Sequence, residues 1–282
     1  MTVVAQGGSR LEAIPRPNSV FQRNLNLVRE LAITQFKLKY TGSALGYVWS
    51  LVKPAMLFGI MYLVFSVLLK AGGKDKEFPI ELLFGIVLWT FFIESTTLAM
   101  NAIAGASDLI RKAYFPRWIL VVSSTASALL TFAINTLLVV VVTLLLGQLH
   151  PSIWSLLAPL YYVELVALVL GVSLLLSALF VFFRDLGHIW EILSLVLFYG
   201  SAVVFPFARI PASLRDLAGL NPIAQIVQDV RHALVDPGDP NIPSMATAIG
   251  PLVIVPILIT IAILIIGFAV FNRLTPKFAE NL

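Results

Sequence analysis

The chain has 282 residues, and its composition is far more apolar than that of a soluble protein: 59% of the residues are hydrophobic, 12% are charged, and the mean hydropathy is +0.94. A typical soluble chain is about 25% charged, because its surface faces water. The composition therefore excludes an ordinary soluble domain and predicts an all-α membrane protein. The absence of cysteine excludes disulfides, cysteine-bound metals and thiol catalysis. We attribute the net charge of +4 to membrane orientation, with no nucleic acid as partner.

The N-terminal part precedes the strongly apolar region. Residues 1–18 are polar and lack the apolar stretch of a signal peptide, so we expect a disordered cytoplasmic tail. Residues 19–53 form a second cytoplasmic region. Within it, apolar residues recur at helical spacing between basic ones from Ser19 to Tyr40, which is typical of an amphipathic helix in the membrane interface. A helix packed on a partner protein is the compatible alternative.

Six apolar stretches define a predicted membrane domain at residues 54–271. A spanning helix needs ~20 mostly apolar residues. The first stretch is short unless residues 45–52 continue it, and Pro54 suits the first turn of its helix. Residues 272–282 predict a polar cytoplasmic tail. The six predicted spans are 54–69, 80–103, 118–146, 154–183, 189–204 and 246–271.

Two connections between the predicted spans differ from plain loops. In residues 105–117, Asp108 lies near a helix start and basic residues follow, which suits the helix dipole, and Pro116 ends the helix. In residues 205–236, prolines interrupt apolar runs that are too short to cross a bilayer. This pattern predicts re-entrant helices, whose irregular backbone is tolerated where protein or water satisfies it.

The distribution of basic residues predicts the orientation. Six spans put both termini on one side of the membrane. More lysines and arginines fall in the N-terminal region, the 105–117 loop, the turn at Arg184 and the C-terminal tail than in the other loops, so we expect both termini in the cytoplasm. We find no internal repeat, which argues against the secondary transporters built from inverted repeats.

Two carboxylates, Glu94 and Glu164, fall inside predicted spans, where ionisable groups are costly and usually functional. Three interpretations stay open: a proton relay, a hydrogen-bonded structural site, or contact with hydroxyl groups in a hydrated path. The histidines, His150, His188 and His232, fall in different loops. We therefore expect no catalytic residue and no metal ligand, and a membrane-embedded enzyme is disfavoured.

The order of several motifs is distinctive. The stretch LGYVWSLVKP covers residues 45–54, LIRKAYFPR covers residues 109–117, Phe183-Arg184-Asp185 follows the fourth span, and the chain ends in FAENL. In this order the chain resembles the permease subunit of type-2 ABC exporters of polysaccharides, the group that handles O-antigen, capsule, teichoic acid and galactan. The alternatives are an ABC-2 exporter of another substrate, such as a lipid or a drug, and an ion-coupled secondary transporter.

The resemblance implies a set of partners. Two copies of the chain would form a dimer in the bacterial cytoplasmic membrane, above two copies of a separate ATPase that binds ATP and magnesium. A polysaccharide linked to polyprenyl diphosphate would pass between the two permeases, with membrane lipid around them. The sequence agrees in one respect, because it contains no phosphate-binding loop of its own.

The resemblance also implies roles for particular residues. Each role has an alternative: an ordinary basic loop for the coupling helix, a plain interfacial anchor for the gate helix, and a plain extracellular loop for the exit gate, which fits poorly with the many apolar residues there. The ATPase-coupling helix would contain Asp108, Leu109, Arg111, Lys112, Tyr114, Phe115, Pro116 and Arg117. The gate helix, within residues 24–40, would contain Arg29, Glu30, Lys37, Lys39 and Tyr40. The exit gate would contain Pro206, Pro211, Asn221 and Pro222.

Aromatic residues are candidates for a polysaccharide conduit, because sugar faces stack on aromatic rings through weak contacts. Phe58, Tyr62 and Phe65 follow helical spacing and share one face of the first span. Core packing or an aromatic belt facing lipid is the alternative for each of them. The candidates are Tyr47, Trp49, Phe58, Tyr62, Phe65, Phe198 and Tyr199.

Overall fold

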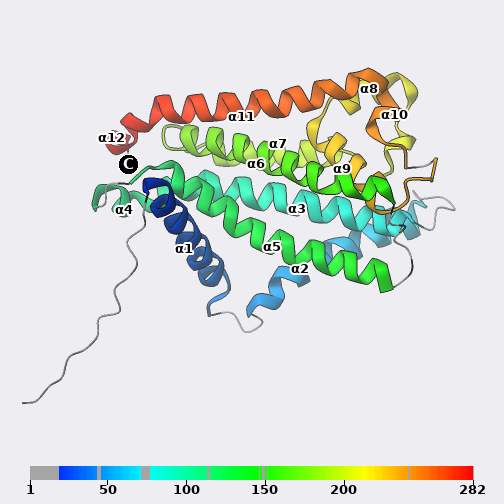
Figure 1. Cartoon of the computed structure of the whole chain (residues 1–282), viewed down its shortest axis with the longest axis horizontal. Coiled ribbons are helices and arrows are strands. Elements are labelled where there is room, and N and C mark those ends of the chain that lie inside the picture. Colours follow the sequence, from blue (N-terminus) through cyan, green and yellow to red (C-terminus); the bar gives the residue numbers. More distant parts are fainter. Residues whose placement is uncertain are drawn as a thin grey trace, which may run out of the picture.

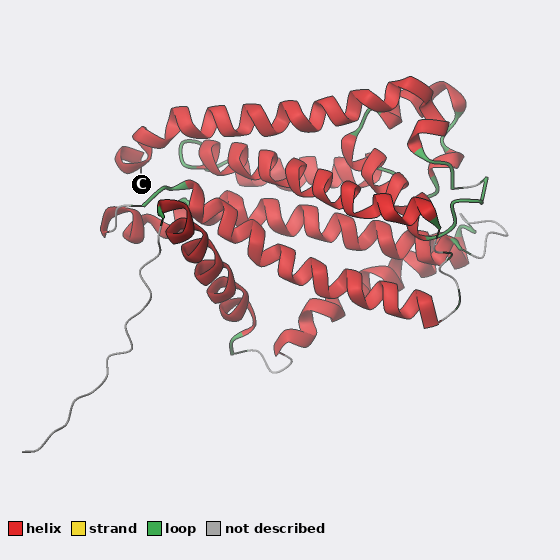
Figure 2. Ribbon diagram, viewed as in Figure 1, coloured by secondary structure: helices red, strands yellow, loops and turns green. Residues whose placement is uncertain are grey.

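A computed structural model describes residues 19–42, 46–70, 77–112, 115–145, 147, 150, 152–240 and 242–281. The described part is built from helices and connecting loops and contains no strand (Figure 2). The all-α prediction is therefore confirmed for these residues. The tail expected at residues 1–18 and the coupling candidate Tyr114 lie outside them.

Among the described residues, five helical segments are long and apolar enough to cross a membrane, and three of them begin and end within three residues of the prediction. Of the other two, the first starts eight residues before Pro54 because residues 46–53 continue the helix, and the last continues six residues beyond residue 271. The fifth predicted span corresponds to α7 (Leu186–Gly200), whose 15 residues make a helix of only about 22 Å. The five long segments are Gly46–Leu68 (η1, α2 and the π-helical η2), Phe78–Ala102 (α3), Trp118–Leu145 (α5), Ile153–Phe180 (η4 and α6) and Met245–Lys277 (α10, η6, α11 and η7).

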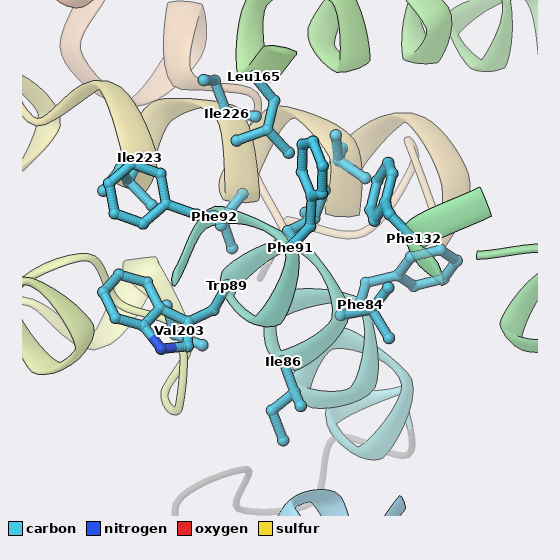
Figure 3. Packing of buried hydrophobic residues seen from close by; sticks show 14 of the residues in the cluster. Phe84, Ile86, Trp89, Phe91, Phe92, Phe132, Leu165, Val203, Ile223 and Ile226 are labelled. Atoms are coloured by element: carbon cyan, nitrogen blue, oxygen red, sulfur yellow. The ribbon is translucent and has the colours of Figure 1, made fainter. Parts of the chain in front are cut away.

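Helix α3 forms the centre of the molecule. Its own apolar side chains are distributed around the whole helix, and 67% of the residues in its most apolar 18-residue stretch are buried. It packs against α5 and α6, and α6 packs in turn against α11. Phe91 of α3 stacks on Phe132 of α5, whereas Trp89 and Phe92 point to the other side of α3 (Figure 3). There they pack on Phe198 and Trp190 of α7.

Helices α6 and α11 approach closely through two glycines. A Cβ atom on Gly171 would lie 2.7 Å from Leu264 Cα, and a Cβ atom on Gly267 would overlap the backbone carbonyl of Gly171. Small residues of this kind let helix backbones touch within a membrane.

Helix α1 (Val20–Tyr40) is the expected amphipathic helix. Ser19 caps it by accepting a hydrogen bond from the backbone N–H of Gln22 (3.2 Å). Val28 and Ala32 are buried on one stripe, and the helix packs on α5. Figure 1 shows α1 running obliquely to the long helices.

The short elements gather at the two ends of the bundle (Figure 1). One end holds α8 and α10, and the other holds α4 and α12. The predicted polar tail differs from expectation, because the helix continues past residue 272 and Phe278 is completely buried against Phe271 and Phe182. The short helices are η3 (Ala104–Ala106), α4 (Ser107–Lys112), η5 (Phe207–Arg209), α8 (Ala212–Gly219), α9 (Pro222–Leu234), α10 (Met245–Ile249), η6 (Gly250–Val253), η7 (Thr275–Lys277) and α12 (Phe278–Asn281), while the long ones include α6 (Ala158–Phe180) and α11 (Ile254–Leu274).

Candidate functional site

A cleft of about 330 Å³ lies where the end of α1, the start of α2 (Trp49–Met61) and the middle of α3 meet. Two lysines and an indole ring line it together with a carboxylate, which gives it cationic, aromatic and acidic groups at once. Such a lining suits a ligand that carries both an anionic group and sugar rings. The lining residues are Lys39, Trp49, Ser50, Lys53, Pro54, Thr90 and Glu94.

An ion pair closes one side of this cleft. The Lys39 ammonium group contacts Glu94 Oε1, and the two side chains remain 27% and 21% exposed. The structure thus pairs one of the two carboxylates of the predicted spans with the last turn of the amphipathic helix. It also brings Lys39, from the gate-helix group, to Trp49, from the conduit group.

Polar side chains continue behind the cleft, between α3 and α5. Thr90, Glu94, Thr131 and Asn135 surround Pro54, whose ring leaves α2 without one backbone hydrogen bond. The Asn135 amide donates to the Thr131 carbonyl (2.9 Å), and both side chains are buried. The seam provides a polar lining deep within an otherwise apolar bundle.

The aromatic candidates divide into an outer and an inner group. Tyr47, Trp49, Tyr62 and Tyr199 are exposed, and Tyr47 stacks on Phe36 of α1 with ring centroids 5.4 Å apart. By contrast, Phe198 is 6% exposed and packs on Trp89 of the core (5.3 Å between centroids).

The remaining two candidates, Phe58 and Phe65, are half-buried against the main core. Phe58 lies beside Tyr62, with ring centroids 5.8 Å apart. The exposed rings therefore lie on the first long segment and at the end of α7.

The predicted coupling segment contains the short helix α4, with an exposed face formed by Asp108, Leu109 and Lys112. Two other members of this group contact their own chain. Phe115 packs into a second core beside Trp118, and Arg117 donates to the Thr275 carbonyl at the end of α11. Pro116 is exposed. The side chains of Arg111 and Tyr40 lie outside the described atoms.

The other gate-helix residues point outward from α1. Arg29, Glu30 and Lys37 are exposed, whereas the packing against α5 uses the opposite stripe. The helix therefore offers a charged surface of mixed sign next to the cleft.

The exit-gate candidates occupy helix starts. Pro206 and Pro211 precede η5 and α8, and Pro222 is the first residue of α9. Asn221 caps α9 by accepting from the Ile223 N–H (3.0 Å), and its amide donates to Ser201 Oγ (2.9 Å). These residues fix how the α8–α9 segment joins the end of α7.

Arg231 of α9 is a central residue to which sequence reasoning gave no role. It is 1% exposed and donates to the carbonyls of Glu81 (2.8 Å), Ala202 (2.9 Å) and Val203 (2.5 Å). Burial lowers the pKa of Arg231 to about 10, while Glu81 acts in the opposite direction, so the guanidinium stays charged at neutral pH. The signal in the sequence is the run of polar residues at helical spacing along α9.

A second buried network joins α6, α9 and α10. The Gln225 amide donates to Asp229 Oδ2 (2.9 Å) and to Glu164 Oε2 (3.3 Å). Asp229 Oδ1 accepts from the Met245 N–H (2.7 Å). Glu164, the second carboxylate of the predicted spans, is thus hydrogen-bonded to α9.

Comparison with known proteins gives a consistent family. Residues 26–235 match the family described as ABC-2 type transporter. An O-antigen export system permease protein of Klebsiella pneumoniae is 28% identical over 247 residues, covering 87% of this chain and 91% of that protein. A protein of the same name from Myxococcus xanthus is 26% identical, covering 91% and 95%. A polysialic acid transport protein of Escherichia coli is 22% identical, covering 74% and 81%.

The family match spans most of the chain, from the middle of α1 to the end of α9, and so includes the cleft, the α4 helix and the α8–α9 segment. The chain is a multi-pass membrane protein and belongs to the ABC-2 type transporter family.

Proposed function

We propose that the chain is the transmembrane permease subunit of an ATP-driven exporter of lipid-linked polysaccharide. The names of the relatives, O-antigen export permease and polysialic acid transport protein, support this substrate class. The observation that carries the proposal is the cleft in which Lys53 and the Trp49 ring lie together, with the Lys39–Glu94 ion pair at its edge. A lysine attracts a diphosphate, and an indole face stacks on a sugar. The chain itself acts as a non-enzymatic component.

The proposed topology has six spans and cytoplasmic termini in the bacterial cytoplasmic membrane. Five spans are the long segments, and the sixth is α7 together with the backbone that follows it to residue 204. Helices α8 and α9 would re-enter the membrane from the outer side, where α9 is almost entirely buried by protein. This arrangement leaves α4, α1 and α12 at the cytoplasmic face.

A second copy of the chain is the proposed partner across the membrane plane. Only 6% of the most apolar window of the first long segment is buried. Its exposed surface is not purely aliphatic, because Tyr47, Trp49 and Tyr62 accompany Lys53 there. A cationic side chain is costly against lipid tails, whereas two copies facing each other would line a polar and aromatic conduit with these groups.

Two copies of a separate ATPase would supply the energy and bind ATP and magnesium. The exposed face of α4, formed by Asp108, Leu109 and Lys112, and the mixed charges on α1 are the proposed docking surfaces. Arg117, which follows α4 in the coupling segment, donates to the Thr275 carbonyl, and this contact would link the docking region to the end of α11.

The test is co-purification with the candidate ATPase followed by an ATP hydrolysis assay. Charge reversal of Asp108→Lys together with Lys112→Glu leaves the interior packing untouched, so a folded permease that has lost the ATPase is the expected result. The matched control is Arg209→Glu, an exposed residue of η5 in the α8–α9 region, which we expect to keep full association.

Two outcomes would contradict the proposal at different points. If no ATPase associates with the native chain, the exporter assignment fails. The second outcome is that the ATPase associates, but neither a polyprenyl-diphosphate sugar nor the Lys53→Gln change alters the rate of ATP hydrolysis. The substrate class is then wrong, while the family assignment stands.

A further inference from the structure

Three loops that are far apart in the sequence bring metal-ligating side chains together at one place. Glu77 precedes α3, His150 lies between α5 and η4 (Ile153–Leu157), and Asp236 follows α9. One ligand atom of each residue lies within 4.8 Å of those of the other two. Sequence reasoning expected no metal ligand, because these residues share no motif and no regular spacing.

The backbone holds two of the three segments side by side. The His150 N–H donates to the Val235 carbonyl (3.2 Å), directly before Asp236. The Asp236 carboxylate is oriented by the Gly238 N–H (2.7 Å). Another histidine of this region, His232, is engaged elsewhere, because its ring bonds to the Ile242 carbonyl (2.7 Å). The backbone thus holds His150 beside Asp236, with Glu77 within reach of both.

The chemistry of this group favours a divalent cation. One imidazole nitrogen and two carboxylate oxygens are the ligand types that Zn²⁺ and similar first-row ions accept, whereas Ca²⁺ and Mg²⁺ prefer oxygen alone. Ligands of one tetrahedral zinc ion are about 3.4 Å apart at bond lengths of about 2.1 Å, so small side-chain rotations would close the site. Two neighbouring carboxylates repel each other, and a cation bound between them would offset this repulsion.

The exposure of the three side chains suits a bound ion. His150 is exposed, so an ion can enter from solvent, and Glu77 and Asp236 are half-buried, so they are partly shielded from competing water. Three protein ligands leave one position for water. We propose that Glu77, His150 and Asp236 form a binding site for a divalent transition-metal cation of the Zn²⁺ class.

The site has a structural consequence that does not depend on the exported substrate. A bound ion would tie the end of α9 to the start of α3 and to the connection between α5 and α6. Two of these elements, α3 and α9, are also joined by Arg231, whose side chain donates to the Glu81 carbonyl in the first turn of α3. The ion would therefore stabilise the α8–α10 end of the molecule.

The experiment uses the full chain, stripped of metal by a chelator and kept in detergent or lipid nanodiscs. Zinc is added in calorimetric titration and in thermal unfolding, and Co²⁺ is added as an optical probe of coordination. We expect one Zn²⁺ per chain, a rise in the unfolding temperature, and a loss of at least about tenfold in affinity for His150→Ala, Glu77→Gln and Asp236→Asn. His188→Ala removes an exposed histidine elsewhere and is the matched control.

Thermal unfolding in the absence of metal shows first whether each variant is folded. If one variant does not fold, the zinc affinities of the other two variants decide the test. Loss of the Co²⁺ absorption band in His150→Ala but not in His188→Ala supports the site. Equal zinc affinity in the native chain and in the folded variants, or a drop only in His188→Ala, overturns it, because the binding is then adventitious.

Discussion

Arg231 provides hydrogen-bond donors for backbone carbonyls in the irregular stretch after α7. The chain leaves regular helix geometry after α7, and Ala202 adopts a left-handed φ of +51°. Carbonyl groups in such a stretch have no helical partner, and leaving them unpaired in the interior is costly. The planar guanidinium supplies several donors from one side chain and satisfies Ala202 and Val203 together with Glu81 of α3.

The first prediction concerns this residue. We expect Arg231→Ala to lower the free energy of unfolding by ~3 kcal/mol or more, because it leaves three buried carbonyls without their donor. Arg231→Lys should recover only part of the loss, since an ammonium group cannot reach all three carbonyls from one position. Thermal unfolding of the purified chain measures both. Arg209→Ala, at an exposed position, is the control, and equal unfolding temperatures for Arg231→Ala and this control would contradict the role.

The two carboxylates of the predicted spans are both engaged, in different ways. Glu94 pairs with Lys39, and because both side chains are partly exposed, the pair contributes at most about 1 kcal/mol to stability. Its significance lies in position, since it fixes the end of α1 against α3 at the edge of the cleft. Glu164 is hydrogen-bonded to Gln225, which links α6 to α9.

At the scale of helices, the contact of α6 with α11 depends on the absence of side chains. At Gly171 and Gly267 the backbones of the two helices are in contact, so a methyl group added at either glycine would push the helices apart. Gly59 of α2 is different, because a Cβ atom there would meet nothing within 4 Å. All three glycines lie in long apolar segments, so the effects of adding one methyl group at each can be compared.

The second prediction follows from this contrast. Gly267→Ala should destabilise the chain by ~1–3 kcal/mol, since overpacking forces the helices apart. Gly59→Ala should be neutral or stabilise by up to ~1 kcal/mol, because alanine has the better helix propensity. Both changes add one methyl group, and unfolding temperature together with the yield of monodisperse protein provides the measurement. A neutral Gly267→Ala would show that the contact is loose.

Sequence reasoning was accurate where a helix ends at a change of polarity. The bounds of α3 and α5 were predicted within a few residues, because charged or proline-containing stretches flank their apolar runs. The start of the first long segment was left open between Pro54 and residues 45–52, because the glycine and serine residues near Gly46 are typical of a loop, and the structure shows that the helix begins at Gly46.

Tertiary contacts were beyond the reach of sequence patterns. Arg231 reads as an ordinary loop cation, and Phe278 as part of a polar tail, yet both are completely buried. In each case the burial is decided by segments distant in the sequence. The same reason explains why Glu77, His150 and Asp236 showed no sign of meeting, and why the cleft became visible only once α1, α2 and α3 were placed together.

At the scale of the whole molecule, the long helices differ in the kinds of side chain that they expose. The exposed face of α11 is entirely apolar along Ile254, Leu258, Ile261, Ile265 and Phe268, which is what lipid tails favour. The exposed face of the first long segment carries aromatic and cationic groups in addition to aliphatic ones. We therefore expect these two surfaces to face different environments.

The last prediction tests this asymmetry through cysteine cross-linking, for which the chain is well suited because it contains no cysteine of its own. Two copies facing each other through α2 would bring Ile60 and Leu63, both exposed, close to the symmetry axis. A disulfide needs Cβ atoms about 3.5–4.5 Å apart, so cross-links should appear at some of these positions and recur with helical spacing. We expect Ile60→Cys or Leu63→Cys to give covalent dimers when native membranes are oxidised, and Leu258→Cys on α11 to stay monomeric. Efficient cross-linking at Leu258 with none on α2 would instead place α11 at the interface and leave the aromatic face of α2 toward lipid, which would remove the proposed conduit.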